Sequence, residues 1–425
     1  MKRALAPALG LAAALILSAC GAAGGAGGGT GAAPAAGDTT LVVWDWKSGD
    51  AATAGYYDAA REAFAAQHPD VEVEFVAQPF DQYYTLLGTA IEAGQGPDVV
   101  LFNGGGQIRS RADALVPLDE YIGDSEARLA GWEAFRDGDT TLAAPLTLQG
   151  MPIYYNKALY RQAGLDPESP PTTLDQLAAN CTAIEQNTEA SCFATGNQEG
   201  IGIQFFMSAF GSGILSDAEY DAWIAGQRDW TSPGVRQIFE QWVQFETNGW
   251  NNAGVNSTTL FNDAFSVFSG GRGAHVIGLL SDVGNWWDLG DFLGEDLGVM
   301  LSPTFTPGST GTLAFDGGIG YGVTSWSADP ALAADLVNAL TSTEALTFFY
   351  TDAGALPSDT EIELDGASPV VQTLVGDLAT GEPALHVVLS ASTQDLMGRL
   401  SQELLSGSVT VDDALTQLAA ADASS

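Results

Sequence analysis

Basic residues are scarce in this chain. Its 425 residues include 14 Lys and Arg against 53 Asp and Glu, which gives a formal net charge of −39 at pH 7. An acidic surface repels the phosphates of nucleic acids and the anionic headgroups of bilayers, so neither is expected to bind the folded protein. The same charge disfavours an acidic ligand, unless one arginine in the pocket outweighs the mean field. The acidity itself is interpreted as a contribution to solubility.

Long apolar runs are absent beyond the N-terminus. The apolar stretch 5–17 follows Lys2 and Arg3 and is too short to cross a bilayer as a stable helix, which is typical of a secretory signal. It ends in Leu17-Ser18-Ala19-Cys20, which resembles the lipobox of bacterial lipoproteins. The resemblance implies cleavage before Cys20 and a lipid on its sulfur, so that the lipid alone holds the protein to the outer face of the bacterial cell membrane. An ordinary secretory signal is the alternative, and it also exports the chain.

Residues 1–20 are therefore assigned to the signal peptide. Residues 21–38 are rich in glycine and alanine, and such a segment cannot bury a core. We expect it to be a flexible tether between the membrane and a folded part that begins near residue 39.

Cysteine and histidine are also sparse. Three histidines are scattered without the spacing of metal ligands: His68, His275 and His386. No HExxH, GxSxG or Walker lysine motif is present, so no metal, catalytic serine or nucleotide cofactor is expected. With Cys20 assigned to the lipobox, Cys181 and Cys192 remain as a pair in an oxidising compartment, and their spacing differs from a redox CxxC motif. We expect them to form a disulfide.

Strands and helices alternate through the first part of the folded region. Apolar runs at 41–44 and 98–102, and strict alternation over 71–76, predict strands, whereas residues 54–67 and a segment starting at 81 have helical spacing. Later strands are predicted near 152–155, 273–280, 297–301 and 320–324. Later helices are predicted over 157–163, 234–247 and 330–340, and one begins with Thr172 or Thr173 as its cap. This alternation is typical of an α/β fold with a mostly parallel sheet.

Six stretches share motifs with one known family. In chain order they are 41–46, 64–73, 93–100, 154–157 with 163–165, 268–274, and 329–345. They include Ala93-Gly94-Gln95-Gly96-Pro97-Asp98 and Tyr154-Tyr155-Asn156-Lys157. Together they resemble the extracellular solute-binding proteins of ABC importers, in the branch related to maltose-binding protein.

The resemblance implies a two-lobed, periplasmic-binding-protein-like fold with crossing hinge strands and a ligand cleft between the lobes. One lobe would hold residues 39–147 and 276–323, and the other 148–275 and 324–425. It further implies a monomer without enzymatic activity that delivers a small solute, a neutral sugar or oligosaccharide, to the transmembrane subunits of a permease.

A sugar offers hydroxyl groups at its edge and C–H groups on its faces, so its receptor needs planar polar groups and aromatic rings. Trp44 and Trp46 lie at the carboxyl end of the first strand, where open α/β sheets bind ligands. We assign Trp44 to the core and expect Asp45 or Trp46 to reach the ligand. After the third strand, Asn103 and Gly104 are candidates, because glycine lets backbone N–H groups approach a ligand.

Further candidates lie near the expected crossings between the lobes. Gln149 has a side-chain amide suited to paired hydroxyls, and one of Tyr154 and Tyr155 is expected to face the cleft. One of Trp286 and Trp287 is expected to stack on the ligand, although the tryptophans lie later than the Gly-Trp pair of the family. Near the last strand the candidates are Asp316, Gly317 and Gly318, with a turn role as the alternative for Asp316.

Three other functions remain open at this point. A secreted glycoside hydrolase would use two carboxylates, and Asp45, Asp282, Asp288 and Asp316 are available. A sensor subunit would use the same cleft. The third is a binding protein for a peptide, a polyamine, a metal or another small solute. The few histidines speak against a metal, and a polyamine would need acidic groups in the cleft, such as Asp45 and Asp316.

Overall fold

The computed structural model describes residues 39–424, except 280–289, 291, 306–307, 310, 365–368 and 379. The signal peptide, the tether and Cys20 therefore lie outside the described residues, as do Trp286 and Trp287. No helix in the described part of the chain has an apolar stretch long enough to cross a bilayer.

The first sheet has the strand order β2–β1–β3–β13–β6. The strand β1 (Thr39–Asp45) runs parallel to β2 (Val71–Ala77) and β3 (Val99–Asn103), whereas β13 (Ile319–Val323) is antiparallel to β3 and to β6 (Ala144–Pro145). The edge strand β2 alternates partly buried and exposed residues, and β3 is almost wholly buried. The carboxyl ends of β1, β2 and β3 meet at one edge of the sheet, because these strands are parallel.

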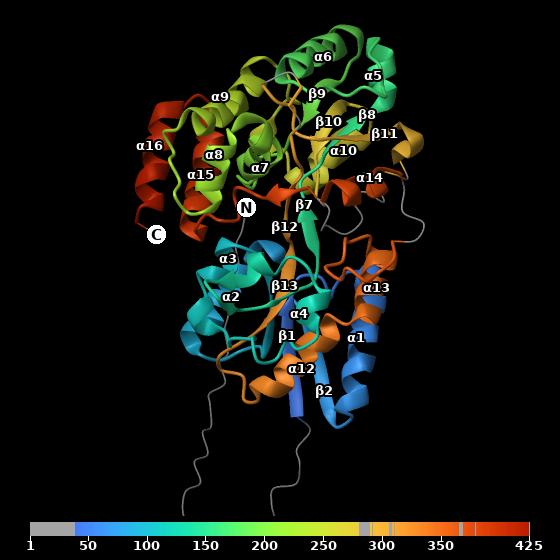
Figure 1. Cartoon of the computed structure of the whole chain (residues 1–425), viewed down its shortest axis with the longest axis vertical. Helices are drawn as coiled ribbons and strands as arrows, with labels where there is room; N and C mark the ends of the chain where they lie inside the picture. The colour runs from blue at the N-terminus through green and yellow to red at the C-terminus, as the bar shows by residue number, and fades with distance from the viewer. Residues whose placement is uncertain are drawn as a thin grey trace, which may run out of the picture. The chain divides into compact units, whose positions relative to one another are not determined.

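Helices cover both faces of this sheet (Figure 1). The helices α1 (Ala54–Gln67), α12 (Pro330–Leu340) and α13 (Thr343–Ala353) share one core with Val99 and Leu101 of β3. The helix α2 (Phe80–Ala93) packs on Val100 and Phe102, which point to the opposite face. Two short helices, α3 (Gly106–Arg109) and α4 (Ser125–Arg128), and the β4 (Arg136–Asp137) and β5 (Thr140–Thr141) hairpin follow β3.

The second sheet has the order β11–β8–β10–β9. Here β8 (Ile153–Asn156) is antiparallel to β10 (Gly273–Ile277) and β11 (Leu297–Met300), and β10 is parallel to β9 (Ser191–Ala194). The other helices are α5 (Lys157–Ala163), α6 (Leu174–Asn187), α7 (Gly202–Ile214), α8 (Asp217–Ile224), α9 (Pro233–Thr247), α10 (Phe265–Ser269), α14 (Pro369–Leu378), α15 (Ala391–Leu405) and α16 (Val411–Asp422).

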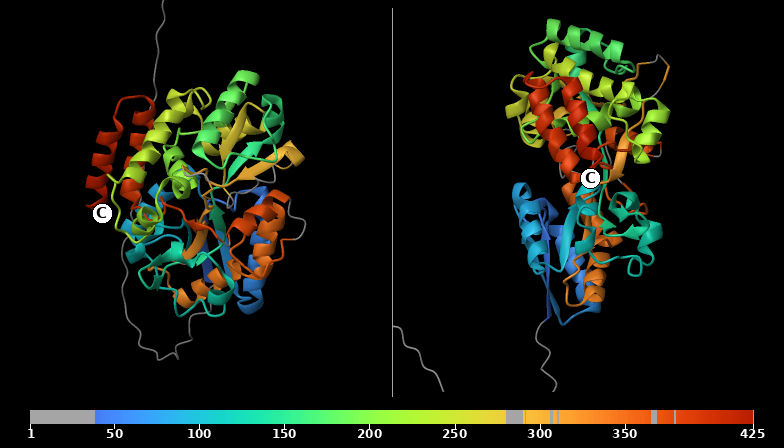
Figure 2. Two further views of the ribbon diagram at one scale, coloured as in Figure 1. Left: turned by 45° about the horizontal axis from the view of Figure 1, so that its top comes forward. Right: turned by 90° about the vertical axis from the view of Figure 1, so that its left-hand side faces the viewer.

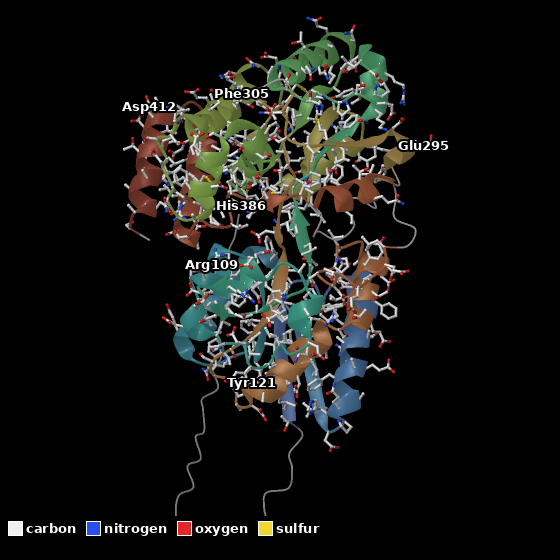
Figure 3. All side chains as sticks on the ribbon, in the orientation of Figure 1. Arg109, Tyr121, Glu295, Phe305, His386 and Asp412 are labelled. Carbon is white, nitrogen blue, oxygen red and sulfur yellow. A yellow bond between two sulfur atoms is a disulfide. The ribbon has the colours of Figure 1, made fainter. Side chains whose placement is uncertain are left out.

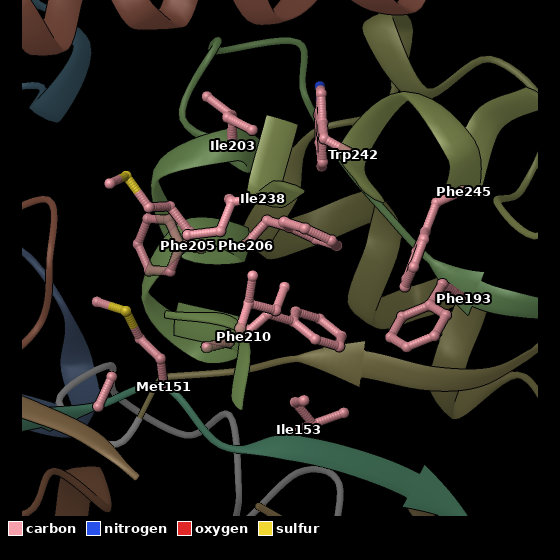
Figure 4. Close-up of a cluster of buried hydrophobic side chains, with 14 of the residues drawn as sticks. Met151, Ile153, Phe193, Ile203, Phe205, Phe206, Phe210, Ile238, Trp242 and Phe245 are labelled. Carbon is pink, nitrogen blue, oxygen red and sulfur yellow. The ribbon is translucent and has the colours of Figure 1, made fainter. Parts of the chain in front are cut away.

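Aromatic residues fill the core beside this second sheet. Phe206 and Phe210 of α7 stack with ring centroids 4.5 Å apart, and Phe245 of α9 lies 5.0 Å from both Phe206 and Phe193 (Figure 4). The apolar face of α9 is thus buried against α7, as the predicted aromatic helix over 234–247 requires.

A third, three-stranded sheet joins the two halves of the chain. Its order is β14–β12–β7, with β12 (Ala314–Gly317) parallel to β14 (Glu382–Pro383) and antiparallel to β7 (Leu148–Gly150). The strand β7 leads from β6 of the first sheet to β8 of the second, and β12 leads directly into β13 (Figure 2). These are the crossing strands that the family resemblance implies.

The lobe boundaries differ from those expected. The strands β10 and β11 pair with β8 in the second sheet, so residues 276–277 and 297–300 lie with the second sheet and not with the first lobe. Conversely, α12 and α13 pack on α1 in the first core, so residues 330–353 do not belong with the second. Tyr56 of α1 fixes this packing by donating a hydrogen bond to the carbonyl of Leu340. The expected boundaries failed because helical periodicity shows that a face is buried, but not against which core.

Several local predictions are confirmed. Helices begin at or within one residue of the predicted positions 54, 157, 234 and 330, and Thr173 caps α6 by accepting a hydrogen bond from the N–H of Gln176. The predicted disulfide between Cys181 and Cys192 is present and ties α6 to β9. His275 lies beside it, donating from Nδ1 to the carbonyl of Cys192 and accepting at Nε2 from Tyr160. Burial lowers the pKa of His275 to about 4.

Replacing both Cys181 and Cys192 with alanine should lower the free energy of unfolding by about 2–4 kcal/mol, because the crosslink limits the unfolded chain. Chemical denaturation of the two forms measures this difference. In the wild-type protein, thiol labelling under denaturing, non-reducing conditions should detect neither cysteine; two labelled thiols would contradict the disulfide.

Candidate ligand-binding site

A buried carboxylate organises the loop after β1. Asp45 has no exposed surface, and its Oδ1 accepts hydrogen bonds from the backbone N–H groups of Lys47 (2.8 Å) and Ser48 (2.6 Å). Burial raises the pKa of Asp45, and the N–H groups of Ser48 and Lys47 oppose the rise. Asp45 therefore shapes the turn. Its side chain is buried in this structure, and its contact with a ligand stays a prediction.

Aromatic rings gather where the loop after β1 meets the start of α2. Trp46 packs edge to face against Phe80, with ring centroids 5.4 Å apart, and against Tyr83, at 4.7 Å; Tyr84 lies 6.3 Å away. We call these four residues the aromatic cluster. Phe80 is 54% exposed and Trp46 is partly buried, so the cluster presents ring surface to solvent. Trp44, assigned to the core, packs against the adjoining core as a partly buried residue.

Asn103 is held against this cluster by one hydroxyl. The Oη atom of Tyr84 accepts hydrogen bonds from the backbone N–H of Asn103 (2.9 Å) and from its Nδ2 (3.2 Å). The guanidinium of Arg111 lies over the Tyr84 ring, 4.8 Å from its centroid. Burial raises the pKa of Tyr84 to about 12, so its hydroxyl stays protonated. Trp46, Asn103 and Arg111 therefore lie around Tyr84, at the carboxyl ends of β1 and β3.

The predicted glycines pack against backbone rather than opening a ligand site. The N–H of Gly104 donates to the carbonyl of Gly318 (3.0 Å), and the N–H of Gly318 donates to that of Thr147 (2.8 Å). A methyl group on Gly317 would lie 2.4 Å from the carbonyl oxygen of Gly131. These glycines were expected to let a ligand approach. Instead, they let segments of the chain approach one another.

Gln149 and Asp316 lie directly opposite each other in the third sheet, on β7 and β12. Directly paired residues of an antiparallel ladder lie on the same face. Asp316 is 9% exposed, and its Oδ1 accepts from the N–H of Gly317 at 2.8 Å. Burial raises the pKa of Asp316 to about 7, although the Gly317 N–H and the charge of Arg109 act to lower it. Two candidates that were nominated separately from the sequence thus lie side by side on β7 and β12.

Arg109 links α3 to the segment that follows β14. Its Nε and Nη2 donate to the carbonyls of Arg136 (3.0 Å) and Glu133 (3.2 Å), and its Nη1 donates to the carbonyl of Val387 (3.2 Å). The N–H of Gly106 donates to the same Val387 carbonyl at 3.1 Å. The start of α3 is thus bonded to a segment that continues into α15.

The same segment is bonded to α7 and α8 from its other side. The Nδ1 of His386 lies 2.8 Å from the hydroxyl of Ser208, and the indole N–H of Trp223 donates to the carbonyl of Leu385 (2.9 Å). Burial lowers the pKa of His386 to about 4, so the imidazole is neutral near pH 7. Figure 3 labels His386 and Arg109 on the two sides of this junction.

Neither tyrosine of the Tyr154-Tyr155 pair is open to a ligand. Tyr154 is fully buried in one core, and Tyr155 is 3% exposed in another, where its hydroxyl donates to the carbonyl of Pro167 (2.7 Å). Gly278 and Gly298 flank the two rings, and a methyl group on either would lie 2.3 Å from ring carbon. Both faces of β8 pack against a core in this structure, and the contact of either tyrosine with a ligand stays a prediction.

Sequence reasoning missed Phe80, Tyr84, Arg109 and Arg111. Phe80 and Tyr84 follow the end of β2 as Trp46 follows the end of β1, so the strand-end rule could have nominated them. The two arginines carry no such signal, because their roles depend on which segments fold over α3.

Residues 46–347 match the model of a family described as bacterial extracellular solute-binding protein. A binding protein of Brucella abortus is 26% identical over 253 residues, which are 56% of this chain and 56% of that protein. The sn-glycerol-3-phosphate-binding periplasmic protein of Yersinia pestis is 24% identical over 182 residues, or 40% and 42% of the two chains. The chain thus spans about half the length of the curated relatives it matches.

Solved structures share the fold over nearly the whole chain. A chitin oligosaccharide binding protein has a TM-score of 0.78 at 16% identity, covering 91% of this chain and 100% of that one. A solute-binding protein from Thermotoga lettingae, bound with α-D-tagatose, has a TM-score of 0.72 at 19% identity, covering 89% and 97%. The two-lobed α/β fold expected from the sequence is therefore confirmed.

The buried Asp316 makes stability depend on pH in a defined direction. Between about pH 4 and pH 7 the unfolded aspartate is ionised while the folded one keeps its proton, so stability falls as the pH rises through this window. Asp316→Asn removes this cost. The free energy of unfolding of Asp316→Asn relative to wild type should therefore rise as the pH goes from 4 to 7. The rise is about 1.4 kcal/mol for each unit by which the pKa of Asp316 differs between the folded and unfolded chain.

Denaturant unfolding at pH 4, 5.5 and 8 measures this gain, with Asp137→Asn in the exposed β4–β5 hairpin as the control for loss of one carboxylate. A difference between Asp316→Asn and wild type that is constant across the three pH values would mean that Asp316 titrates as it does in the unfolded chain.

Proposed function

Because the chain belongs to the bacterial extracellular solute-binding protein family, we propose that it captures a sugar or oligosaccharide between its two lobes and delivers it to the permease of an ABC importer. The observation that carries this proposal is the aromatic cluster beside Asn103, at the carboxyl ends of β1 and β3. A family of binding proteins does not support the glycoside hydrolase alternative.

The aromatic cluster and the polar residues have complementary tasks. Trp46 and Phe80 offer ring surface that suits the C–H face of a sugar. The amides of Asn103 and Gln149 and the carboxyl of Asp316 offer donors and acceptors for hydroxyls. Chitin oligosaccharide and tagatose, the ligands of two structural relatives, have the same mixture of apolar faces and hydroxyl edges. One of Trp286 and Trp287 is retained as a further stacking residue.

Closure of the lobes would complete the site. Trp46 and Asn103 belong to the first lobe, whereas Gln149 and Asp316 lie on the strands that cross between the lobes. A ligand that contacts both sets binds the closed form more tightly and shifts the population toward it by that difference in affinity. The closed form would then be the one that the permease engages.

The export signal and the lipobox-like sequence place this activity outside the cytoplasm. We propose that the lipid on Cys20 holds the protein to the outer face of the cell membrane, with residues 21–38 as the tether. A monomer captures the solute within reach of the permease.

Trp46→Ala should weaken sugar binding by roughly 1–3 kcal/mol while the fold is retained, because a stacking ring is lost from the site. A thermal-shift screen over mono- and oligosaccharides identifies the ligand, since a ligand that binds the folded state raises the melting temperature. Titration calorimetry then compares wild type, Trp46→Ala and the control Phe348→Ala, an exposed aromatic residue on α13. Equal affinities for all three proteins would overturn the stacking role of Trp46.

Cys20→Ser should release the protein from the membrane into the medium or periplasm, because serine cannot form the thioether that carries the diacylglyceryl group. Fractionation and intact mass of the wild type and the variant measure this. A soluble wild-type protein without acyl mass would show that the signal is an ordinary secretory one.

A further inference from the structure

Arg111 is a partly buried cation without a carboxylate partner. In the described part of the chain, most arginines have a carboxylate oxygen within 4.0 Å: Arg61, Arg128, Arg136, Arg161, Arg228, Arg236 and Arg399. Arg111 has none at this distance, although the chain has 53 acidic residues. A cation that loses part of its hydration without gaining an anion is costly to maintain, and such a residue is a candidate for a function in binding.

The contacts of Arg111 leave part of its hydrogen-bonding capacity unused. Its Nη1 donates to the carbonyl of Gln107 (2.7 Å), to the Gln107 side chain (3.0 Å) and to the hydroxyl of Ser110 (3.1 Å). Nε and Nη2 have no hydrogen-bond partner among the residues that the structure describes. Burial lowers the pKa of Arg111, and the phenol of Tyr84 and the carboxylate of Asp395 oppose this. The guanidinium therefore keeps its charge and has donors to offer.

The position of Arg111 connects it to the proposed sugar site. Its guanidinium lies 4.8 Å from the centroid of the Tyr84 ring, so its orientation is fixed by a stacking contact. The Tyr84 hydroxyl holds Asn103, and the Tyr84 ring lies beside Trp46. A sugar on Trp46 and Asn103 would therefore place a substituent within reach of Arg111. From the second lobe, Asp395 of α15 acts on the same cation.

We infer that the site accepts a sugar carrying an anionic group, a carboxylate or a phosphate, which binds the free donors of Arg111. This inference rests on the proposed sugar-binding function and adds the charge of the ligand to it. The net negative charge of the chain repels acidic ligands at long range, but salt screens this repulsion beyond about 10 Å. Salt weakens the direct contact between a guanidinium and an anion much less. Asp395 forms no salt bridge with Arg111, but its negative charge acts on the guanidinium and opposes an incoming anion.

The test compares matched pairs of ligands that differ in one acidic group. The probes are galactobiose with digalacturonate, and glucose with glucose 6-phosphate, measured by titration calorimetry on the mature protein. In each pair that binds, the acidic member should bind roughly tenfold or more tightly, because charge-assisted hydrogen bonds are stronger than neutral ones. The carboxylate and phosphate pairs show which anion the site accepts.

Three variants assign the preference to Arg111. Arg111→Gln should bring the acidic and neutral members to similar affinity, while Asp395→Asn should increase the preference by removing the competing carboxylate. Arg61→Gln is the matched control, because Arg61 also stacks on a ring, 4.7 Å from Phe75, but lies outside the proposed site. It should leave the ratio unchanged.

The outcomes separate this inference from the proposed function. Neutral sugars that bind as well as their acidic partners, or a ratio unaffected by Arg111→Gln, would overturn the role of Arg111 and leave sugar binding intact. Failure of every neutral and acidic sugar to bind would overturn the proposed function, and this inference with it. A melting temperature of Arg111→Gln close to wild type shows that a changed ratio does not come from misfolding.

Discussion

The backbone hydrogen bonds between β14, β12 and β7 fix the strands that connect the two lobes relative to one another. They pair Asp316 with Gln149, and three residues further along the chain Ile319 of β13 pairs with Asn103 of β3. One continuous stretch, 314–323, therefore fixes polar candidates on two sheets relative to each other. The glycines near this stretch are required because other backbone segments lie against it, at distances that leave no room for a side chain. The backbones of the polar candidates on β7, β12 and β3 are thus positioned by main-chain hydrogen bonds.

The aromatic and polar parts of the site are supported in different ways. The aromatic cluster packs on the face of the first sheet that α2 covers. There Tyr83 is fully buried, and the ring of Trp46 packs against the ring of Tyr83. The polar groups are held by hydrogen bonds to atoms that are themselves fixed, such as the Tyr84 hydroxyl. A rigid cluster needs little reordering when a ligand binds, and this lowers the entropic cost of binding.

The sequence predicted local structure well and spatial neighbours less well. Alternation over 71–76 and helical spacing over 54–67 depend on each segment alone, so both were predictable. The assignment of α12 and α13 to the first core depends on a return of the chain across the lobes, which periodicity does not encode. At the candidate site, the strand-end rule nominated Trp46 and Asn103, which both lie beside Tyr84. The rule does not show that Asp45 forms a turn or that Gly104 packs against backbone, because a residue at a strand end can do either. The burial of Tyr154 and Tyr155 was also not predictable, because it depends on cores that cover both faces of the second sheet.

Three buried ionisable groups change the stability of the fold in opposite directions when the pH falls. Between about pH 4 and pH 6.5, His275 and His386 remain neutral in the folded state while the same residues of an unfolded chain take up protons. Asp316 does the reverse, because it keeps in the folded state a proton that the unfolded chain releases. Acidification through this range therefore destabilises the fold through two imidazoles and stabilises it through one carboxyl. For a protein exposed to surroundings that the cell does not buffer, this partial cancellation flattens the dependence of folding on external acidity.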